Sequence, residues 1–544
     1  KRAVFGTPDK LYEHDGDRIV DITPITTAVT LANCFGTSSG STRVCCSDAA
    51  HGRVVGDYVY FTSTAAFNNV SLSTNVYPVI SVDSANVFTI SVTDAANATG
   101  SDTGSATFNY LIPTGNSIAV AGTGYGAAIY QATVCASNTR AWNNAASADA
   151  TDIVFDITQW SLDNWGDDVI ANRSGSNIFY FNSDASTVPI RATSITTSPI
   201  SVNSIVVSPN DRHLIALGAN EYATAATVSG TFNPMLVRWS DQDDRTNWVP
   251  SVSSTSGEVV LTDGTRIVGG VRSKNAINIW TDNSLWLMQF AGPPFTFKFT
   301  QAGTNCGMIG PHAGIDYNGI TYWMGYDNFY RFDGQVRTLD CTVRRYIFDR
   351  LAVKYKDKVF TGINSEFKEI IWLYASTGSG VSDCDSYVIY SPENDYWVYG
   401  DVIFTTFSDK EIFGNTITTG ATVSSNYIYN NEPAGIFTAN NNVLTSFVES
   451  ADFDVDDGNA ILFMDKLIPD FDLSTGKIKV KLITKKYPES TETVTKEFFV
   501  TETTQKVNLR ARGRQAKIRV SCSSQNASWQ WGSVRIGIQG DGER

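Results

Sequence analysis

Histidines are the first residues to consider for acid–base chemistry or metal binding, and this chain of 544 residues has four of them. His14, His51, His213 and His312 lie far apart in the sequence. Metal-binding histidines commonly occur as closely spaced pairs, which this sequence lacks. We interpret each histidine as a loop residue or a structural residue, so we expect no metal site and no cofactor.

Two glycine-containing stretches match functional motifs in their letters but not in their context. Residues 36–40 read G-T-S-S-G, like the nucleophile elbow of hydrolases, which requires a strand, a sharp turn and a helix. Here the letters lie in a Ser- and Gly-rich part of an all-β pattern. Gly122, Gly124 and Gly126 alternate without the following amphipathic helix that a dinucleotide site requires. We interpret residues 36–40 as a loop and expect no nucleotide site at the second stretch.

Acidic residues offer two further possibilities. Four aspartates between positions 452 and 458 resemble a calcium loop, but glycine is seventh instead of sixth and Phe463 replaces the glutamate at position twelve. We interpret them as a solvated turn. A glycosidase needs two carboxylates, which can come from anywhere in the chain. The nearest local pair, Glu366 and Glu369, lacks a recognisable motif around it, so we do not expect an enzyme.

One strongly basic cluster stands near the C-terminus, in the sequence RARGRQAKIR. In a strand, Arg510, Arg512 and Arg514 share one face, which is able to bind phosphate or the carboxylates of a partner. Lys517 and Arg519 follow on the next stretch. Three interpretations stay open: a solvated sheet face, a contact with a partner or another subunit, and a contact with DNA.

The elements that carry these residues are predicted to be β-strands. Between Leu236 and Phe348, short apolar strands with recurring aromatic residues alternate with tight polar turns, as at Asp282-Asn283 and Asp333-Gly334. This repeated meander predicts the blades of a β-propeller. Residues 240–248 (SDQDDRTNW) resemble a degenerate Asp-box, a structural turn of propeller blades. A single short helix is predicted over residues 342–355, because Val343, Ile347 and Leu351 share a helical face.

The predicted fold class is mainly β, with a β-propeller-like body, an inserted small β-barrel and a C-terminal β-sandwich. Residues 1–33 are assigned to the first propeller strands and 34–111 to the inserted barrel. Residues 112–440 form the propeller-like body, and six longer strands in residues 441–544 predict the sandwich. Within the insertion, HGRVVGDYVYF and VYPVISVDSANVFTI resemble the small β-barrel first described in ubiquitin-activating enzymes, which recurs in phage structural proteins.

Composition narrows the possible functions. The formal net charge is -14, which disfavours a broad nucleic-acid-binding surface but is compatible with a tube whose acidic wall repels phosphates. No apolar run approaches the length of about 18 residues that a membrane span requires, so no stable membrane span is expected. The eight cysteines are too few for a disulfide scaffold, and most are interpreted as buried or free thiols.

Strings along the chain resemble the tail nozzle (tail hub or tail tube) protein of short-tailed bacteriophages. The resemblance covers most of residues 160–544, and its specificity comes from the order and extent of strings that are individually weak. These strings are LVRWSDQDDRTNWVPS, IWTDNSLWLMQFAGPPFTFKF, GTNCGMIGPHAGIDYNGITYWMG, FYRFDGQV, NLRARGRQAKIRVSC and WQWGSVRIGIQGDGER. The inserted domain departs from a minimal nozzle.

The resemblance implies a structural protein of the virion tail that has no catalytic turnover. It implies a homo-hexameric ring below the head-to-tail adaptor, with tail fibres or spikes as further partners. Genomic DNA would pass through the lumen without sequence-specific binding, and we expect gating loops around residues 405–425. The alternative is a receptor-binding or glycan-degrading tail component.

Overall fold

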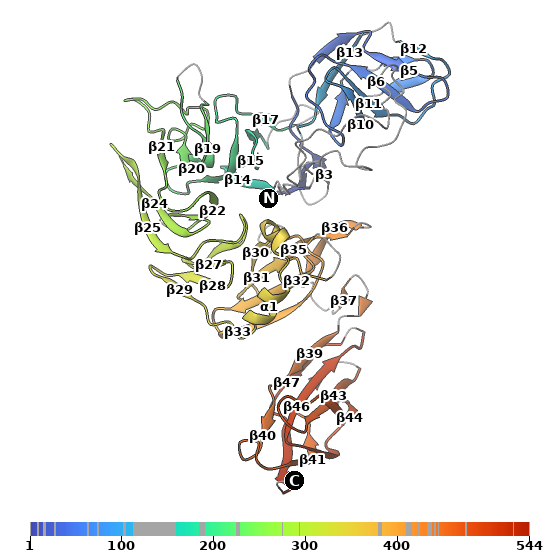
Figure 1. Ribbon diagram of the computed structural model, residues 1–544, viewed down its shortest axis with the longest axis vertical. Helices are drawn as coiled ribbons and strands as arrows, with labels where there is room; N and C mark the ends of the chain where they lie inside the picture. Colours follow the sequence, from blue (N-terminus) through green and yellow to red (C-terminus); the bar gives the residue numbers. More distant parts are fainter. Residues whose placement is uncertain are drawn as a thin grey trace, which may run out of the picture. The chain divides into compact units, whose positions relative to one another are not determined.

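The chain folds almost entirely into antiparallel β-sheets, which confirms the predicted mainly β fold class (Figure 1). The computed structural model has one α-helix and one 3-10 helix among the residues that it describes, and neither is long and apolar enough to cross a membrane. Gly122 to Gly126 lie outside these residues. The described residues are 2–7, 10–14, 18–26, 29–62, 65–72, 75–101, 105–112, 159–183, 191–224, 229–274, 276–292, 294–378, 383–409, 416–422, 425–431, 438–439, 442–443, 445–473, 476–525 and 527–542.

Five consecutive four-stranded meanders form the propeller-like body, as the alternating pattern predicts. We call them blades A to E. Blade A holds β14 (Trp160–Trp165), β15 (Asp168–Arg173), β16 (Ile178–Phe181) and β17 (Thr193–Ser194); blade B holds β18 (Val202–Val207), β19 (Leu214–Asn220), β20 (Phe232–Trp239) and β21 (Gly257–Val260). Blade C holds β22 (Ile267–Arg272), β23 (Ile277–Thr281), β24 (Ser284–Gly292) and β25 (Thr296–Thr304). Blade D holds β26 (Gly314–Tyr317), β27 (Ile320–Met324), β28 (Phe329–Phe332) and β29 (Val336–Thr338); blade E holds β30 (Phe360–Asn364), β31 (Glu369–Tyr374), β32 (Ser386–Ser391) and β33 (Tyr396–Asp401).

The first strands of successive blades lie next to one another, so the blades follow each other around a common axis. Blades C, D and E each bury one tryptophan on the second strand: Trp280, Trp323 and Trp372 are 0% exposed. The Trp323 ring lies 5.3 Å from the Trp280 ring and 5.4 Å from the Tyr330 ring. These large rings fill a core that is continuous through the three blades, which holds the sheets rigidly side by side.

Two three-stranded sheets flank the blades. β1 (Ala3–Gly6), β2 (Leu11–His14) and β3 (Ile19–Asp21) pack on blade A, where a Cβ atom at Gly6 would come within 2.0 Å of the Trp160 ring. Only glycine permits this close approach. β34 (Thr406–Ser408), β35 (Thr416–Thr422) and β36 (Ser425–Asn431) follow blade E. Much of the stretch predicted to form gating loops is therefore sheet.

The inserted domain is one strongly bent eight-stranded sheet in the order β12-β5-β6-β11-β10-β7-β13-β4. Register shifts in β10, between Val79 and Ser81 and between Val82 and Ser84, accompany this bend. The sheet includes β4, which the predicted boundary at residue 34 assigns to the propeller. Its strands are β4 (Val29–Ala32), β5 (Phe35–Thr37), β6 (Arg43–Ser47), β7 (Tyr58–Phe61), β10 (Val76–Ser84), β11 (Val87–Ser91), β12 (Gly100–Ser101) and β13 (Ser105–Tyr110), with β8 (Ala65–Phe67) and β9 (Val70–Leu72) as a separate hairpin.

One short helical connection joins blades D and E. α1 (Arg344–Arg350) lies inside the predicted helix, with Ile347 buried, and the 3-10 helix η1 (Val353–Lys358) follows it. The predicted helix is thus interrupted near Leu351, whose φ and ψ are extended.

The chain divides into two compact units, residues 1–431 and residues 432–544, and the second unit is the β-sandwich. Its larger sheet has the order β39-β46-β43-β44 with β40 beside β46, its smaller sheet has the order β45-β41-β48, and both bury side chains in one core. The strands are β37 (Thr438–Ala439), β38 (Asn442–Val443), β39 (Ser446–Glu449), β40 (Phe453–Asp454), β41 (Leu462–Ile468), β42 (Phe471–Leu473), β43 (Ile478–Lys485), β44 (Thr493–Val500), β45 (Val507–Gly513), β46 (Gln515–Cys522), β47 (Trp529–Trp531) and β48 (Arg535–Gly540).

Candidate functional site

The predicted basic cluster does not form one continuous stripe. Arg510 and Arg512 are exposed on β45 of the smaller sheet, whereas Lys517 and Arg519 lie on β46 of the larger sheet. The inward-facing side chains of both strands pack in the same core, so their outer faces point away from each other. Arg514 follows the end of β45 and donates to the backbone oxygen of Asn459 at 2.8 Å.

Carboxylates neutralise most of this cluster. The Lys517 Nζ atom lies 2.9 Å from Glu449 Oε1 and 2.6 Å from Glu492 Oε1, and Arg519 lies 3.5 Å from Glu449 Oε2. The Arg512 Nε atom lies 2.9 Å from Asp541 Oδ2. Cations that already face carboxylates are poorly placed to bind phosphate, so the geometry favours a solvated sheet face for Lys517 and Arg519. Arg510 stays an exposed candidate for a contact, and so does Arg512, because its side chain is 56% exposed and solvent screens its pair with Asp541.

Charge is distributed unequally between the two units. Residues 432–544 hold 15 Lys or Arg and 15 Asp or Glu, while residues 1–431 hold 26 against 40. The whole net charge of -14 therefore belongs to the propeller and barrel unit.

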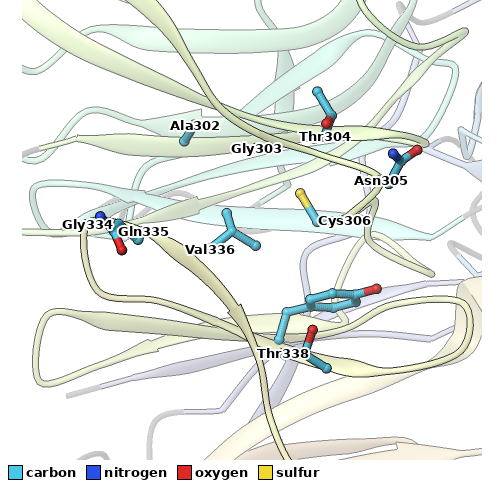
Figure 2. A pocket seen from close by; sticks show the side chains of 10 residues that line it. Ala302, Gly303, Thr304, Asn305, Cys306, Gly334, Gln335, Val336 and Thr338 are labelled. Atoms are coloured by element: carbon cyan, nitrogen blue, oxygen red, sulfur yellow. The ribbon is translucent and has the colours of Figure 1, made fainter.

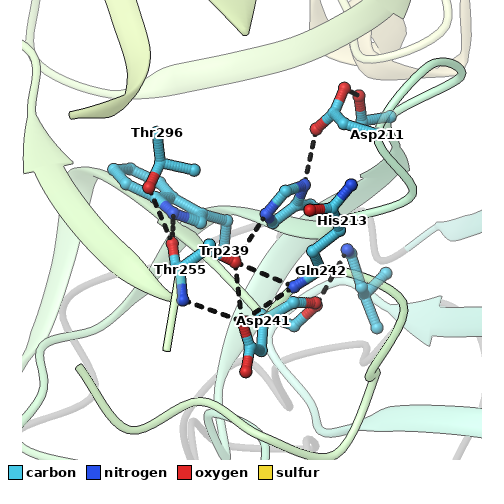
Figure 3. A network of polar contacts seen from close by, with 10 residues as sticks. Asp211, His213, Trp239, Asp241, Gln242, Thr255 and Thr296 are labelled. Carbon is cyan, nitrogen blue, oxygen red and sulfur yellow. Dashed lines mark hydrogen bonds and ion pairs between the residues drawn. The ribbon is translucent and has the colours of Figure 1, made fainter. Parts of the chain in front are cut away.

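A buried polar network surrounds His213 in blade B (Figure 3). The His213 Nδ1 atom lies 2.5 Å from Asp211 Oδ2, and its Nε2 atom lies 3.0 Å from Thr255 Oγ1. The order Asp, His, hydroxyl resembles a nucleophilic triad. However, Thr255 Oγ1 donates to Asp241 Oδ1 at 2.6 Å, and the backbone oxygen of Thr255 accepts from the Trp239 indole at 2.8 Å. The hydroxyl is engaged, so we interpret the network as structural.

This network also fixes the turn that resembles an Asp-box. Asp241, at the start of the turn, accepts hydrogen bonds from Thr255, Gln242 and Asn247. Burial raises the pKa of Asp241, but these hydrogen bonds outweigh burial and lower it from the usual value. Trp248, at the end of the turn, is 1% exposed. Asp211 lies two residues before His213 in the sequence, whereas Thr255 lies 42 residues away and is brought to His213 by the fold. The sequence therefore predicted the turn and a structural histidine, but not the contact with Thr255.

Side chains from distant blades meet at the axis of the propeller-like body. Gln159, just before blade A, donates to the backbone oxygen of Asp357 at 2.5 Å. The His312 Nε2 atom lies 3.0 Å from the Trp160 oxygen, and Arg266 pairs with Asp357 at 3.6 Å. Burial lowers the pKa of His312, which the Trp160 carbonyl partly opposes. These contacts join blade A to the entries of blades D and E and close this end of the axis.

The surface of the described residues includes two cavities, and the lining of the first is mainly polar. A groove of about 560 Å³ lies between β25 and β29 and includes Cys306 and Thr338 (Figure 2). Burial raises the pKa of Cys306 to about 11, so at neutral pH it is a thiol and not a nucleophilic thiolate.

A second cavity, of about 700 Å³, lies at the end of blade E and contains Arg350, Asp385 and Asp401. The Ser386 hydroxyl lies 3.2 Å from Asp385 Oδ1 and 3.3 Å from Asp401 Oδ1, so it stands between two carboxylates. Arg350 lies 3.9 Å from Asp401 Oδ1. The exposed lining of this cavity is mainly apolar, and carboxylates at the edge of such a cavity are able to bind hydroxyl-rich molecules.

The structure keeps the other sequence candidates apart. His51 hydrogen-bonds the backbone at Ser84 and Arg53 inside the barrel, and His14 lies on β2. Residues 36–37 end strand β5 in the barrel sheet, without a helix after them. Of the aspartates at 452–457, Asp456 and Asp457 lie in a turn, as predicted, whereas Asp454 ends strand β40 and Asp452 pairs with Lys485 at 2.7 Å. Glu369 starts β31 and accepts from the Tyr396 hydroxyl at 2.9 Å, and burial raises its pKa.

Comparisons with known proteins return no matching family model and no matching curated protein. Among solved structures, the phage phi92 endosialidase aligns with a TM-score of 0.19 at 13% identity, covering 80% of this chain and 79% of that chain. An exo-β-1,3-galactanase of Phanerochaete chrysosporium aligns with a TM-score of 0.23 at 8% identity, covering 70% and 95%. The AztD protein of Citrobacter koseri aligns with a TM-score of 0.25 at 9% identity, covering 78% and 93%. Likenesses this low support no conclusion about function.

Proposed function

We propose that this chain is a structural protein of a bacteriophage tail that forms the tail nozzle. In this proposal six copies form a ring-shaped conduit below the head-to-tail adaptor, which retains the genome and conducts it during ejection without catalytic turnover. The supporting observation is the ordered set of strings that resembles nozzle proteins, because these strings lie in strand β20 of blade B, in strands β23 to β29 of blades C and D, and in the sandwich strands β45 to β48. Tail fibres or spikes are the further partners of this ring.

The geometry of the body constrains where DNA passes. Gln159, Trp160, His312 and Asp357 meet at the axis of the blades, so a duplex has no path through a single propeller. A conduit therefore has to lie between copies, which repeat one heterologous contact around a ring. The net charge of -14 on the propeller and barrel unit suits a wall that repels phosphates. Arg510 and Arg512, exposed on the sandwich, are proposed as contacts with a neighbouring subunit or partner.

Electron microscopy of the purified protein, alone and mixed with its adaptor, tests this function. Six-fold rings with a central channel are expected. The proposal is wrong if the protein stays monomeric with its adaptor and particles that lack it still retain and eject DNA.

A second candidate is a receptor-binding or glycan-degrading tail component. The observation that favours it is the cavity that holds Asp385 and Asp401 together with Arg350. Three-fold spikes or monomers that release reducing ends from host polysaccharide would support this candidate, provided that Asp401→Asn abolishes the release. If the polysaccharide stays intact after incubation with the protein, the conduit is the better-supported function.

A further inference from the structure

The connection between blades D and E concentrates positive charge on an acidic unit. Residues 344–358, which we call the α1–η1 segment, contain six Lys or Arg and two Asp, a net charge of +4. Subtracting this from the -14 of residues 1–431 leaves -18 for the rest of that unit. The segment is therefore a positively charged stretch within an acidic unit. From the sequence it was predicted only as a helix.

Two cations of the segment bond to neutral oxygens. Arg344 donates to the backbone oxygen of Asp327 at 3.2 Å and to Asn328 Oδ1 at 3.1 Å. The Lys356 ammonium donates to the Tyr326 hydroxyl at 3.3 Å. Such acceptors position a cation without cancelling its charge, in contrast to the two carboxylates around Lys517. Because Arg344 and Lys356 both contact the turn between β27 and β28, the surface is continuous across that turn.

Three of the remaining cations face carboxylates: Arg345 and Arg350 are paired weakly, whereas Lys358 is paired closely. Arg345 pairs with Asp349 at 3.3 Å, but its side chain is 94% exposed, so solvent screens the pair strongly. Arg350 lies 3.9 Å from Asp401, and Lys358 pairs with Asp383 at 2.5 Å. These carboxylates, together with Asp327 on the turn, reduce the positive charge of the surface without cancelling it.

Aromatic rings are interleaved with these cations. Lys356 lies 5.0 Å from the centre of the Tyr326 ring, and Arg350 lies 4.7 Å from that of Tyr346. Lys354 lies over the Tyr355 ring at 5.4 Å. Tyr326 and Tyr346 are 43% and 36% exposed, so the rings are accessible as well as the charges. A ring holds its cation in place by a cation–π contact without cancelling the charge, so these cations stay available to phosphate.

We propose that the α1–η1 segment contacts the phosphate backbone of duplex DNA. The inference rests on the proposed function, since it names the surface that a DNA-conducting ring would turn toward its cargo. A neighbouring protein is the less suitable partner, because protein interfaces bury an apolar core and Val353 is the one aliphatic side chain of the segment that is strongly exposed. The acidic remainder of the unit repels phosphate, which keeps the contact weak and lets DNA slide.

Fluorescence anisotropy with a labelled duplex of arbitrary sequence tests this inference on the full chain. Binding is expected to weaken as NaCl rises, with a log–log slope of about -3 if three to four phosphates are contacted. The triple variant R344Q/K354Q/K356Q is expected to lose at least about tenfold in affinity at 50 mM NaCl and to flatten the slope by about 2 to 3. The matched control K477Q/K479Q/K481Q, on the sandwich, is expected to bind within about twofold of the parent chain.

Circular dichroism and thermal melting verify that each variant is folded. Lys354 is exposed, so the single variant Lys354→Glu supplies the test if the triple variant does not fold, with a loss of about threefold or more expected at 50 mM NaCl. Equal loss in the sandwich control, or full binding by the variants, would overturn the inference. If the variants bind DNA as well as the parent chain but no longer self-associate, as measured by mass photometry, the segment is a protein contact instead. If DNA binding behaves as expected but electron microscopy shows no rings, the inference holds and the nozzle function fails.

Discussion

Single buried tryptophans hold neighbouring blades together. Trp323 is 0% exposed, contacts the Trp280 and Tyr330 rings, and donates from its indole to the backbone oxygen of Cys306 at 2.9 Å. Trp323→Ala is expected to lower the free energy of unfolding by about 3–5 kcal/mol, because it opens a cavity and leaves the Cys306 oxygen unpaired. Urea unfolding followed by circular dichroism measures this loss. Val353→Ala, at a 62% exposed side chain, is the control and should change stability by less than about 0.5 kcal/mol.

Acid sensitivity is expected from Asp241 in the turn of blade B. Its pKa is lower in the folded chain than in the unfolded chain, so its stabilising effect is complete above the unfolded value of about 4. That stabilisation is lost as the pH falls through the lower folded pKa. Asp241→Asn should therefore be less stable at pH 7, and its stability should fall less between pH 5 and pH 3. Thermal melting across this range measures the difference, and parallel pH profiles would contradict the assignment.

Buried thiols give a separate test of the packing. Burial raises the pKa of Cys306 and Cys341 to about 11 and that of Cys384 to about 12. At pH 8 these groups are protonated and shielded, so iodoacetamide should leave them unmodified in the native chain and alkylate them in urea. Peptide mapping by mass spectrometry identifies each site. Rapid native labelling of Cys384 would show that the core of blade E is open.

At the scale of elements, local patterns predicted the blades well because each is a meander of consecutive strands. Apolar residues at alternate positions, as in residues 277–281, indicate a strand, and Asp282-Asn283 indicates the turn after it. The basic cluster was less predictable. Alternation shows which side chains share a face of one strand, but it does not show that the turn after Arg512 carries the chain into a different sheet. Contacts such as Gln159 with Asp357 join residues so distant in sequence that no local pattern indicates them.

The larger sheet of the sandwich offers an element-scale prediction. Lys517 bridges Glu449 and Glu492 with a side chain that is 14% exposed, whereas Arg510 is exposed on the other sheet. Lys517→Ala should lower the free energy of unfolding by about 1 kcal/mol at low salt, and the loss should shrink in 0.5 M NaCl because salt screens these pairs. Arg510→Ala is the matched control and should leave stability unchanged. Chemical denaturation of the whole chain measures both, and equal losses would contradict the geometry.

At the scale of the whole molecule, the unequal division of charge between the two units determines which surfaces of neighbouring copies repel one another. The propeller and barrel unit carries the entire net charge of -14, while the sandwich unit is balanced. Copies that approach through the first unit repel one another, and the balanced sandwich is electrostatically better suited to a contact. A ring of six such copies would therefore assemble against a long-range repulsion that salt can screen.

This repulsion makes ring assembly, if the nozzle proposal holds, dependent on ionic strength. Raising NaCl from 0.1 M to 1 M shortens the screening length from about 10 Å to about 3 Å, which removes repulsion between exposed charges on neighbouring copies. The fraction of six-fold rings counted in electron micrographs at fixed protein concentration should therefore rise with salt. R510A/R512A should lower this fraction at every salt concentration if these arginines contact the neighbouring subunit, while circular dichroism stays unchanged. Rings that dissociate as salt rises would instead show that attraction between opposite charges, and not apolar contact, holds the copies together.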